Sequence, residues 1–394
     1  MNITIQPRKL QGRLHIIPSK SQAHRLLICS AFADRETTLF CSETNDDIEA
    51  TARCLRSLGA KILRTQAGYQ ITPVKQLPSA ASLDCGESGS TLRFLLPIVG
   101  ALGIDATFLL SGRLPNRPLS PLWEEMSRMG CILSRPSENT IRCRGQLQSG
   151  AYTIDGSVSS QFITGLLFAI ALLEGDSTLS VTGNIESLPY IQMTQSALSL
   201  FGIETDGYVV RTPHGFTTPG NVFVEGDWSN GAFFLAANAL GSHVEVCGLD
   251  PQSQQGDRAC FDWIPKLADH CVIPAGDIPD LVPILSVVAA ANNGAVFRNI
   301  SRLRLKESDR VSSVMAMLNS LGIASEATDS ALTVYPGIFH GGIVDSFRDH
   351  RIAMAAAIAA TKAGSPVTIL NAESVTKSYP KFWEEYKRLG GIYE

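Results

Sequence analysis

The chain has 394 residues, a formal net charge of −4 at pH 7, 44% hydrophobic residues and 18% charged residues. This length exceeds what one hydrophobic core usually serves, so two domains are expected. The small net charge argues against a general nucleic-acid or anionic-membrane binder. No apolar run reaches the roughly 20 residues of a membrane-spanning helix, and the N-terminus alternates like a strand rather than like a signal peptide.

The nine cysteines are an odd number and include no CxxC pair. This pattern favours reduced, buried thiols in a cytoplasmic protein over a zinc site or a disulfide framework.

Six short polar segments each precede an Ala-rich apolar run and predict the first turn of a buried helix. In chain order they are residues 19–25, 87–90, 159–161, 227–229, 278–280 and 349–351. Most lie roughly 70 residues from the next, which indicates internal repetition. Because helix N-termini offer free N–H groups and partial positive charge, a cluster of these segments would bind anions.

The third repeat shows the repeated unit most clearly. We expect an apolar helix over 162–173, a strand over 177–182 and an amphipathic helix from about Pro189 to Gly202. The closing glycine recurs in the other units, since glycine accepts the positive φ of a helix C-cap. Its other positions are Gly59, Gly130, Gly322 and Gly390. Ordinary α/β alternation without repetition is the alternative, and the shared spacing and shared polar segment argue against it.

Six units divide three and three. We expect one domain over 18–226 and a second domain that joins 1–17 to 227–394, with the N-terminal strand returning to the C-terminal domain. The fourth unit is shorter than the others, which indicates that a β-hairpin is missing there. The predicted fold class is α/β (α+β) with two similar domains, and charged segments at their interface would imply closure around a ligand.

Two charged motifs supply candidate phosphate ligands. Lys20 stands beside small residues, with Arg25 about one turn later, a pairing that suits a phosphate. A solvated basic first turn is the alternative. In the run 305–310, Lys306 and Arg310 would share one helix face if the run is helical. There the alternative is an exposed, salt-bridged helix.

Further cations stand near the other segments. Arg351 would lie at the mouth of a buried helix, where an unpaired cation is costly unless an anion arrives. Lys377 and Arg117 add positive charge in two loops. So many cations exceed what one phosphate needs and suit two substrates that each carry a phosphate and a carboxylate. Among them, Asp280 and Glu307 are either salt-bridge partners or proton-transfer groups.

Along essentially its whole length, the sequence resembles the 5-enolpyruvylshikimate-3-phosphate synthase family. The matching phrases, in family order, are PSKSQAHR, GESGSTLR, NRPL, DGSVSSQF, SLPY, VEGD, IPD, LKESDR, RDHRIAM and TKSYP. The resemblance implies the enolpyruvyl transferase fold, an inverse α/β barrel with three βαβαββ units in each domain and an active site in the interdomain cleft. It also implies transfer of the enolpyruvyl group of phosphoenolpyruvate to the 5-hydroxyl of shikimate-3-phosphate, with release of phosphate, in the shikimate pathway. No metal or organic cofactor is implied, and a cytoplasmic monomer without nucleic-acid or membrane partners is expected.

The resemblance also assigns residues by position. Shikimate-3-phosphate would contact Lys20, Ser21, Arg25, Ser159, Ser160, Gln161, Ser187, Tyr190, Asp280 and Lys306. Phosphoenolpyruvate would contact Lys20, Gly89, Arg117, Gln161, Arg310, Arg351 and Lys377. Lys20, Asp280 and Glu307 would be catalytic: Asp280 as the base toward the 5-hydroxyl, and Glu307 as the donor of a proton to the methylene carbon of phosphoenolpyruvate.

Two positions depart from the family pattern. Glu87 stands where many members have Asn, and its charge would weaken the binding of phosphoenolpyruvate. Arg302 stands where some members have Asn. Two rival functions stay open: the sister transferase that acts on UDP-N-acetylglucosamine, whose loop cysteine is absent from 111–119, and a non-catalytic polyanion binder, which gives no use for Asp280 and Glu307.

Overall fold

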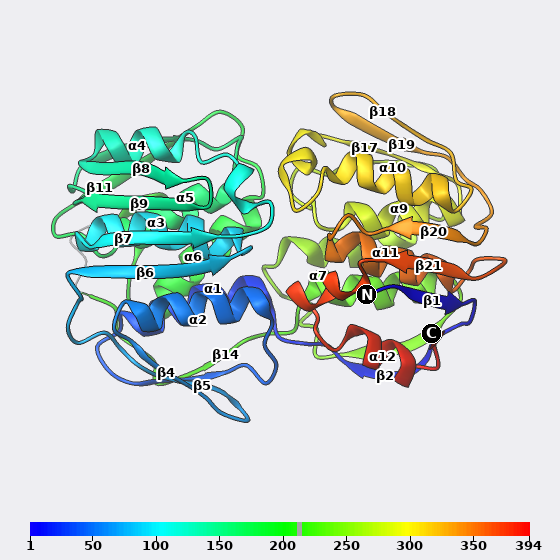
Figure 1. The fold of residues 1–394 in the computed structure, drawn as a ribbon, viewed down its shortest axis with the longest axis horizontal. Coiled ribbons are helices and arrows are strands. Elements are labelled where there is room, and N and C mark those ends of the chain that lie inside the picture. Colours follow the sequence, from blue (N-terminus) through cyan, green and yellow to red (C-terminus); the bar gives the residue numbers. More distant parts are fainter. Residues whose placement is uncertain (211–214) are drawn as a thin grey trace. The chain divides into compact units, whose positions relative to one another are not determined.

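The computed structural model describes residues 1–210 and 215–394. The chain forms two compact units. Unit 1 joins Met1–Ser19 to Glu225–Glu394, and unit 2 is the continuous segment Lys20–Val224 (Figure 1). Relative to the boundaries expected from the sequence, Pro18, Ser19, Glu225 and Gly226 thus belong to unit 1.

Six of the helices begin at the polar segments, as predicted. Unit 2 contains α1 (Lys20–Ala31), α2 (Asp46–Ser57), α3 (Gly89–Leu102), η1 (Leu114–Asn116), α4 (Leu122–Arg128), α5 (Ser160–Ile170) and α6 (Leu188–Leu200). Unit 1 contains α7 (Trp228–Ala239), η2 (Gly256–Ala259), α8 (Cys260–Lys266), α9 (Val282–Ala291), η3 (Ser301–Leu305), α10 (Arg310–Ser320), α11 (His350–Ala360), η4 (Ala372–Lys377) and α12 (Phe382–Arg388). The six polar segments stand at or just before the starts of α1, α3, α5, α7, α9 and α11.

Each unit has three small sheets. The strands of unit 2, in spatial order, are β14 (Asn221–Phe223), β3 (Thr37–Phe40), β5 (Gly68–Thr72) and β4 (Lys61–Arg64); β6 (Ala80–Gly86), β7 (Asp105–Leu110), β9 (Thr140–Gly145) and β8 (Cys131–Ser137); and β10 (Ala151–Asp155), β11 (Ser177–Thr182), β13 (Val209–Val210) and β12 (Thr205–Asp206). Those of unit 1 are β15 (His243–Cys247) and β2 (Gln11–His15); β16 (Cys271–Pro274), β17 (Ala295–Arg298), β19 (Ala331–Val334) and β18 (Ser325–Ala327); and β20 (Gly342–Asp345), β21 (Val367–Leu370), β1 (Ile3–Gln6) and β22 (Ile392–Tyr393).

One pairing pattern recurs in these sheets, which confirms the repetition. Each sheet contains one parallel pair. In four sheets one strand of that pair also pairs antiparallel with a β-hairpin, and in the sheet of β20 and β21 the two terminal strands β1 and β22 take the place of the hairpin. The sheet of β15 and β2 has only the parallel pair, so the missing hairpin of the fourth unit is confirmed. Among the described strands the sheets stay separate and form no closed barrel.

Two strands belong to one unit, while the helix that follows each of them in the chain belongs to the other unit. β2 leads into α1 of unit 2, but it pairs with β15 of unit 1. Conversely, β14 leads into α7 of unit 1, but it pairs with β3 of unit 2. The N-terminal β1 lies between β21 and β22, so both ends of the chain are built into one sheet of unit 1.

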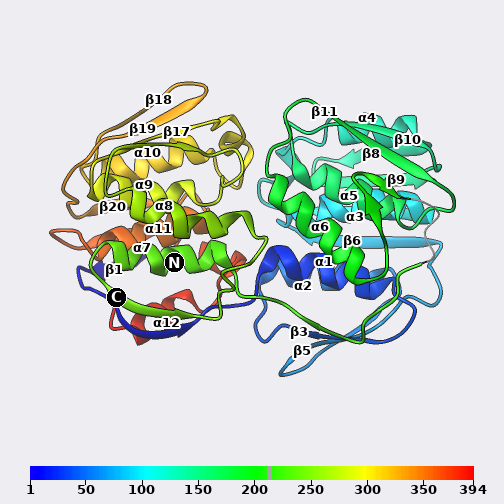
Figure 2. The ribbon, with the colours of Figure 1, turned by 180° about the vertical axis from the view of Figure 1, so that it is seen from behind.

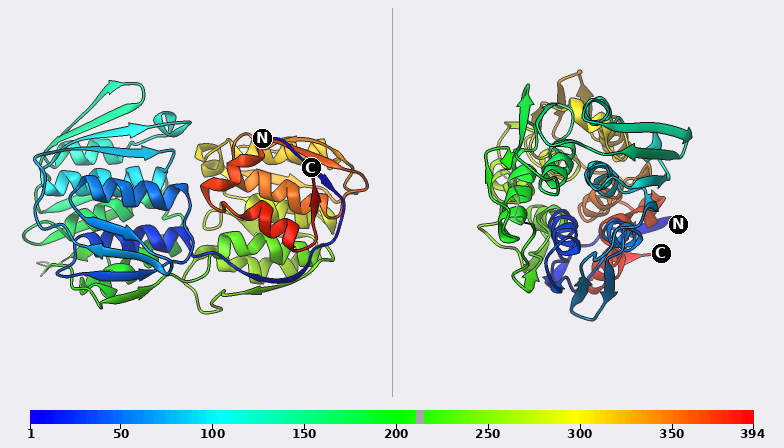
Figure 3. Two further views of the ribbon diagram at one scale, coloured as in Figure 1. Left: turned by 60° about the horizontal axis from the view of Figure 1, so that its bottom comes forward. Right: turned by 90° about the vertical axis from the view of Figure 1, so that its left-hand side faces the viewer.

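The odd-numbered helices form the centre of each unit. α3, α5, α9 and α11 are buried almost throughout, as their apolar sequences require, because a helix without a polar face must be covered on every side. Strands lie outside them in both units (Figures 2 and 3). No helix of the described residues is long and apolar enough to cross a bilayer.

Polar side chains start these buried helices and leave the first-turn N–H groups partly satisfied. Ser88, Ser159, Asp227 and Asp349 each accept a hydrogen bond from a backbone N–H of the turn they precede, in α3, α5, α7 and α11 respectively. Such a cap contributes about 1 kcal/mol. The same segments therefore end the strands, start the helices and present the charged residues discussed below.

Candidate active site

The acidic and basic residues predicted in unit 1 converge on Arg310, the first residue of α10. Its side chain is 1% exposed and holds three carboxylates. Nη1 lies 2.5 Å from Asp280 Oδ1, Nη2 lies 2.8 Å from Glu307 Oε2, and Nε lies 2.8 Å from Asp349 Oδ2. Asp349, which also caps α11, accepts a further hydrogen bond from the Ser308 hydroxyl at 3.0 Å. The two candidate proton-transfer groups thus share one guanidinium.

Asp280 is surrounded by positive charge. Lys306 Nζ lies 3.5 Å from Asp280 Oδ1, and Arg351 Nη2 lies 3.5 Å from Oδ2. Burial by itself raises the pKa of Asp280, but the charges of Lys306, Arg310 and Arg351 outweigh it and hold the pKa well below its ordinary value. The carboxyl is therefore ionised at neutral pH and can accept a proton.

The same surroundings weaken the charge of Lys306. Burial lowers the pKa of its amine to about 8, an effect that Asp280 opposes and that Arg310 and Arg302 reinforce. Lys306 therefore changes its charge just above neutral pH, which makes it the residue of this cluster that responds most directly to an incoming anion.

Lys306 and Arg310 would share a helix face only if the run 305–310 were helical, and that condition is not met. Lys306 follows η3 in an extended conformation, with φ −87° and ψ −162°, and α10 begins only at Arg310 after its cap Asp309. The two cations nevertheless meet at Asp280, Lys306 from the loop after η3 and Arg310 from the start of α10.

Arg351, the second residue of α11, is 2% exposed. Among the described residues, its Nε and Nη1 have no hydrogen-bond acceptor, and its guanidinium lies 6.0 Å from the centre of the Phe233 ring. Because a buried guanidinium with unused donors is costly, its geometry suits an anion as the missing acceptor. Lys377, the last residue of η4, is half-buried.

In unit 2, Lys20 forms an ion pair at the first turn of α1. Its Nζ lies 2.8 Å from Oδ2 of Asp47, the second residue of α2, and the two side chains are 15% and 8% exposed. The N-terminal dipole of α2 favours a carboxylate at that place. Sequence reasoning missed Asp47, because acidic residues in a first helical turn are common and carry no sign of a distant partner.

Arg25 brings together residues predicted for shikimate-3-phosphate. It donates to the Ser21 carbonyl at 2.6 Å, to the Tyr190 carbonyl at 2.8 Å and to the Thr194 hydroxyl at 2.9 Å. Burial lowers the pKa of Arg25 to about 10, so it remains a cation at neutral pH. Ser187, which precedes Tyr190 on α6, is buried and adopts a left-handed conformation with φ 56°.

The start of α3 gathers residues predicted for phosphoenolpyruvate. A Cβ on Gly89 would lie 2.7 Å from Arg117 Nη1 and 2.8 Å from Arg93 Nη1, so only glycine fits there without displacing the two guanidiniums. Arg93 donates to Gln161 Oε1 at 3.0 Å, and Gln161 donates to the Ser90 hydroxyl at 2.9 Å. Gln161 follows Ser159 and Ser160 at the start of α5, which places that segment beside α3.

Arg93 was missed by sequence reasoning. It lies one turn after Gly89 on an otherwise apolar helix and is 3% exposed. A lone arginine inside the buried helix GSTLRFLLPIVGAL was the available signal, since such a cation needs a partner.

The two departures from the family pattern lie at different depths. Glu87 is exposed and packs against Gly112. Arg302, in η3, is 8% exposed and faces Lys306 closely enough to lower the pKa of that amine.

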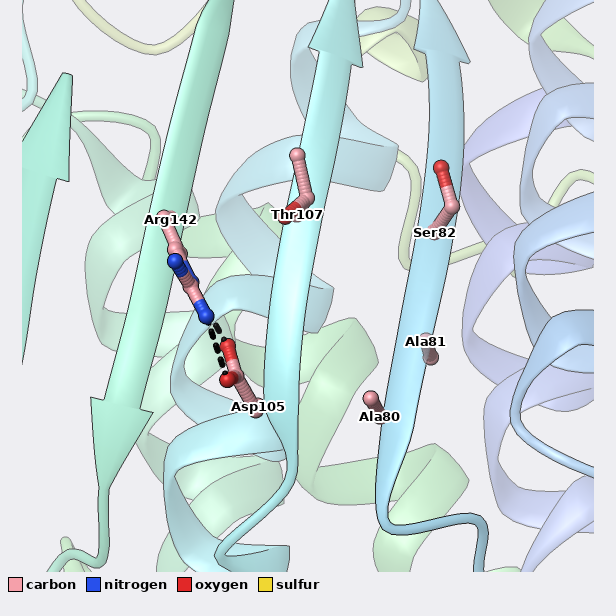
Figure 4. Close-up of a pocket in the computed structure, with 6 residues that line it drawn as sticks. All are labelled: Ala80, Ala81, Ser82, Asp105, Thr107 and Arg142. Atoms are coloured by element: carbon pink, nitrogen blue, oxygen red, sulfur yellow. Dashed lines mark hydrogen bonds and ion pairs between the residues drawn. The ribbon is translucent and has the colours of Figure 1, made fainter. Parts of the chain in front are cut away.

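A shallow depression lies elsewhere on unit 2 (Figure 4). It is lined by Ala80, Ala81, Ser82, Asp105, Thr107 and Arg142. Arg142 and Asp105 form a two-pronged ion pair across it, with distances of 2.9 and 2.7 Å. The first three of these residues belong to the beginning of β6, Asp105 and Thr107 to β7, and Arg142 to β9. β6 reaches the candidate site at its other end, just before α3.

All nine cysteines are free thiols; seven are buried, and Cys247 and Cys271 are partly exposed. Among the described residues, no group of three or more His, Cys, Asp or Glu side chains is arranged to hold a metal ion.

Comparison with known proteins gives one consistent result. The family model of EPSP synthase (3-phosphoshikimate 1-carboxyvinyltransferase) matches residues 5–277 and 270–386. Relatives named 3-phosphoshikimate 1-carboxyvinyltransferase from Clostridium kluyveri and Clostridium acetobutylicum are each 37% identical to this chain, covering 99% of it and 97% of their own length.

Solved structures show the same fold at lower identity. The EPSP synthase of Acinetobacter baumannii superposes with a TM-score of 0.82 at 23% identity, covering 100% of this chain and 99% of its own. The enolpyruvyl transferase NikO of Streptomyces tendae gives a TM-score of 0.76 at 17% identity, covering 100% and 98%. The two-unit repeat, the full-length match and these relatives agree, and the chain belongs to the EPSP synthase (3-phosphoshikimate 1-carboxyvinyltransferase) family.

Proposed function

We propose that this chain transfers the enolpyruvyl group of phosphoenolpyruvate to the 5-hydroxyl of shikimate-3-phosphate and releases phosphate. The observation that carries the proposal is the placement of Asp280 and Glu307 on the single guanidinium of Arg310, with Lys306 and Arg351 beside Asp280. A polyanion binder would gain nothing from two carboxylates inside its cationic cluster. Membership of the family supports the same reaction.

Substrate binding would use the cations of both units. Shikimate-3-phosphate is assigned to Lys20, Ser21, Arg25, Ser159, Ser160, Gln161, Ser187, Tyr190, Asp280 and Lys306. Phosphoenolpyruvate is assigned to Lys20, Gly89, Arg117, Gln161, Arg310, Arg351 and Lys377. Arg25 can receive a phosphate because it stays charged when buried, and Arg351 because its Nε and Nη1 have no acceptor within the described chain.

The chemistry begins with proton transfer from the Glu307 carboxyl to the methylene carbon of phosphoenolpyruvate. In the substrate-free protein Glu307 Oε2 lies 2.8 Å from Arg310 Nη2. An incoming anion competes for Arg310 and so favours the protonated carboxyl that the reaction needs. The acid is therefore prepared by substrate binding.

Addition and elimination then follow with a complete proton balance. Protonation leaves an oxocarbenium-like centre, which the 5-hydroxyl attacks while Asp280 takes its proton. The resulting tetrahedral intermediate expels phosphate as its C–O bond breaks, Asp280 passes its proton to the departing phosphate, and the methyl carbon returns a proton to Glu307. Neighbouring cations stabilise the charge that develops on the departing phosphate.

A coupled phosphate-release assay with both substrates tests this proposal. Wild-type protein should release phosphate only when shikimate-3-phosphate and phosphoenolpyruvate are both present, and UDP-N-acetylglucosamine should not replace the former. Asp280→Asn and Glu307→Gln should each lower kcat by about 10²–10⁴-fold while keeping or tightening the binding of shikimate-3-phosphate. Turnover by both variants at the wild-type rate would make the assignment wrong. That the enzyme is a cytoplasmic monomer stays a prediction.

A further inference from the structure

A series of hydrogen bonds inside unit 2 joins the N-terminal halves of α1, α2 and α3. His24 Nδ1 lies 2.7 Å from Thr51 Oγ1, Thr51 Oγ1 lies 2.7 Å from Thr91 Oγ1, and Thr91 Oγ1 lies 2.8 Å from Ser88 Oγ. The exposed fractions of the four side chains are 0% for His24, Thr51 and Thr91 and 1% for Ser88. Buried hydroxyl and imidazole groups linked in this way hold one arrangement, because breaking any link leaves a polar atom unsatisfied.

Each group in this series of hydrogen bonds donates its proton toward Ser88. Thr91 donates its hydroxyl proton to Ser88, so its oxygen accepts from Thr51. Thr51 has then used its own proton, and its oxygen accepts from His24 Nδ1. Burial lowers the pKa of His24 to about 3, so the imidazole is neutral and carries its single proton on Nδ1. Among the described residues Nε2 has no hydrogen-bond partner, and the ring stands edge-on to Phe94.

Both ends of this series of hydrogen bonds lie next to residues of the candidate site. His24 is four residues after Lys20 on α1, and Thr51 is four residues after Asp47 on α2, so each lies one turn below a member of the Lys20–Asp47 ion pair. Ser88 directly precedes Gly89 and caps α3. The Thr91 hydroxyl also lies 3.5 Å from the Asp47 carbonyl.

We infer that His24, Thr51 and Thr91 are positioning residues that fix the separation between Lys20 and Gly89, and thereby the fit of phosphoenolpyruvate. The inference rests on the function proposed above, which assigns both residues to that substrate. None of the three touches the substrate site directly; they act through the ion pair and through the start of α3. Because misplacement by about 1 Å can cost on the order of 10²-fold in rate, such a network has a measurable effect.

The test removes single hydroxyls and keeps the shape of the side chain. Thr51→Val and Thr91→Val should each raise the KM for phosphoenolpyruvate at least fivefold, and by more than they raise the KM for shikimate-3-phosphate, because Lys20 is assigned to both substrates and Gly89 to phosphoenolpyruvate alone. Thr91→Ser keeps the hydroxyl and should retain the wild-type KM for phosphoenolpyruvate.

Unit 2 offers a matched control in a second buried threonine pair. Thr37 Oγ1 and Thr218 Oγ1 lie 2.7 Å apart and are 0% and 1% exposed, at the start of β3. Thr37→Val should lower Tm about as much as Thr51→Val does, yet leave both KM values unchanged. If the three valine variants lose Tm equally and none alters the KM for phosphoenolpyruvate, the network is only structural and the inference is wrong.

Nuclear magnetic resonance of ¹⁵N-histidine gives a readout that needs no turnover. Wild-type His24 should show a protonated Nδ1 that does not titrate between pH 5 and 9, and Thr51→Val should shift its tautomer balance. The His24 signals are identified by their loss in His24→Asn. An Nε2-protonated His24 in the wild type would overturn the inference even if the transfer reaction is confirmed. A wild-type protein without any turnover would instead refute the proposed function, and with it the substrate named here.

Discussion

The pH dependence of shikimate-3-phosphate binding should report the charge of Lys306. Its amine is held near Asp280 and Arg310, and burial lowers its pKa to about 8. With that pKa the amine is charged in about 90% of molecules at pH 7 and in about 10% at pH 9. The dissociation constant of shikimate-3-phosphate should therefore rise about tenfold between these pH values.

The dissociation constant rises with pH because the charged form of Lys306 is the one that attracts the substrate. Raising the pH neutralises Lys306, and a neutral amine no longer attracts the anionic substrate, so binding weakens. The substrate phosphate itself changes little in this window, since its second pKa lies near 6. Lys306→Arg keeps its charge at every pH used and should remove most of the dependence.

Isothermal titration with shikimate-3-phosphate alone, without phosphoenolpyruvate, measures binding while no turnover occurs. Titrations at pH 7, 8 and 9 on the wild type and on Lys306→Arg complete the comparison. A wild-type dissociation constant that is flat over this range, or the same slope in both proteins, would refute the reasoning.

Three further outcomes are expected. Asp349→Ala removes a buried partner of Arg310 and the cap of α11. It should therefore lower the free energy of unfolding, measured by urea denaturation, by about 3–5 kcal/mol. A loss no larger than that caused by Asp262→Ala at an exposed position would contradict this. Arg348→Gly should raise the free energy of unfolding by about 0.5–1 kcal/mol, because Arg348 is exposed and has φ 56°. The left-handed conformation costs a non-glycine residue about 1–2 kcal/mol, and the greater entropy of glycine in the unfolded chain offsets part of that gain. An unchanged or lower Tm would contradict strain at this position. Glu87→Asn should lower the KM for phosphoenolpyruvate about two- to fivefold, and less at high salt, since an exposed like charge near the anion contributes up to about 1 kcal/mol; a higher KM would show that Glu87 helps binding.

The sequence predicted the local parts of this molecule well. Each of the six polar segments precedes or starts a buried helix, because capping residues and an apolar run are both encoded within about ten residues of one another. The closing glycines likewise adopt positive φ, for example 106° at Gly59 and 82° at Gly322. The shortened fourth unit was also visible, since a missing hairpin changes the spacing along the chain.

The partners of the charged residues could not be predicted in the same way. Asp47 meets Lys20, and Asp349 meets Arg310, only after separate helices have packed against each other. Arg310 would share a helix face with Lys306 only if the run 305–310 were helical, but the chain between them is a loop, and both side chains reach Asp280. Spacing rules describe one element at a time and carry no information about these encounters. The assignment of individual residues to the two substrates stays a prediction.

The pairing of β1 and β2 has a consequence for synthesis of the chain. These strands are translated well before their partners: β2 must wait for β15, and β1 must wait for β21 and β22. Unit 2 is continuous, so it can complete its core while the two early strands still have bare edges. The nascent segment that contains β1 and β2 thus keeps unpaired strand edges for longest, and slowing translation after residue 224 should increase aggregation of the nascent protein.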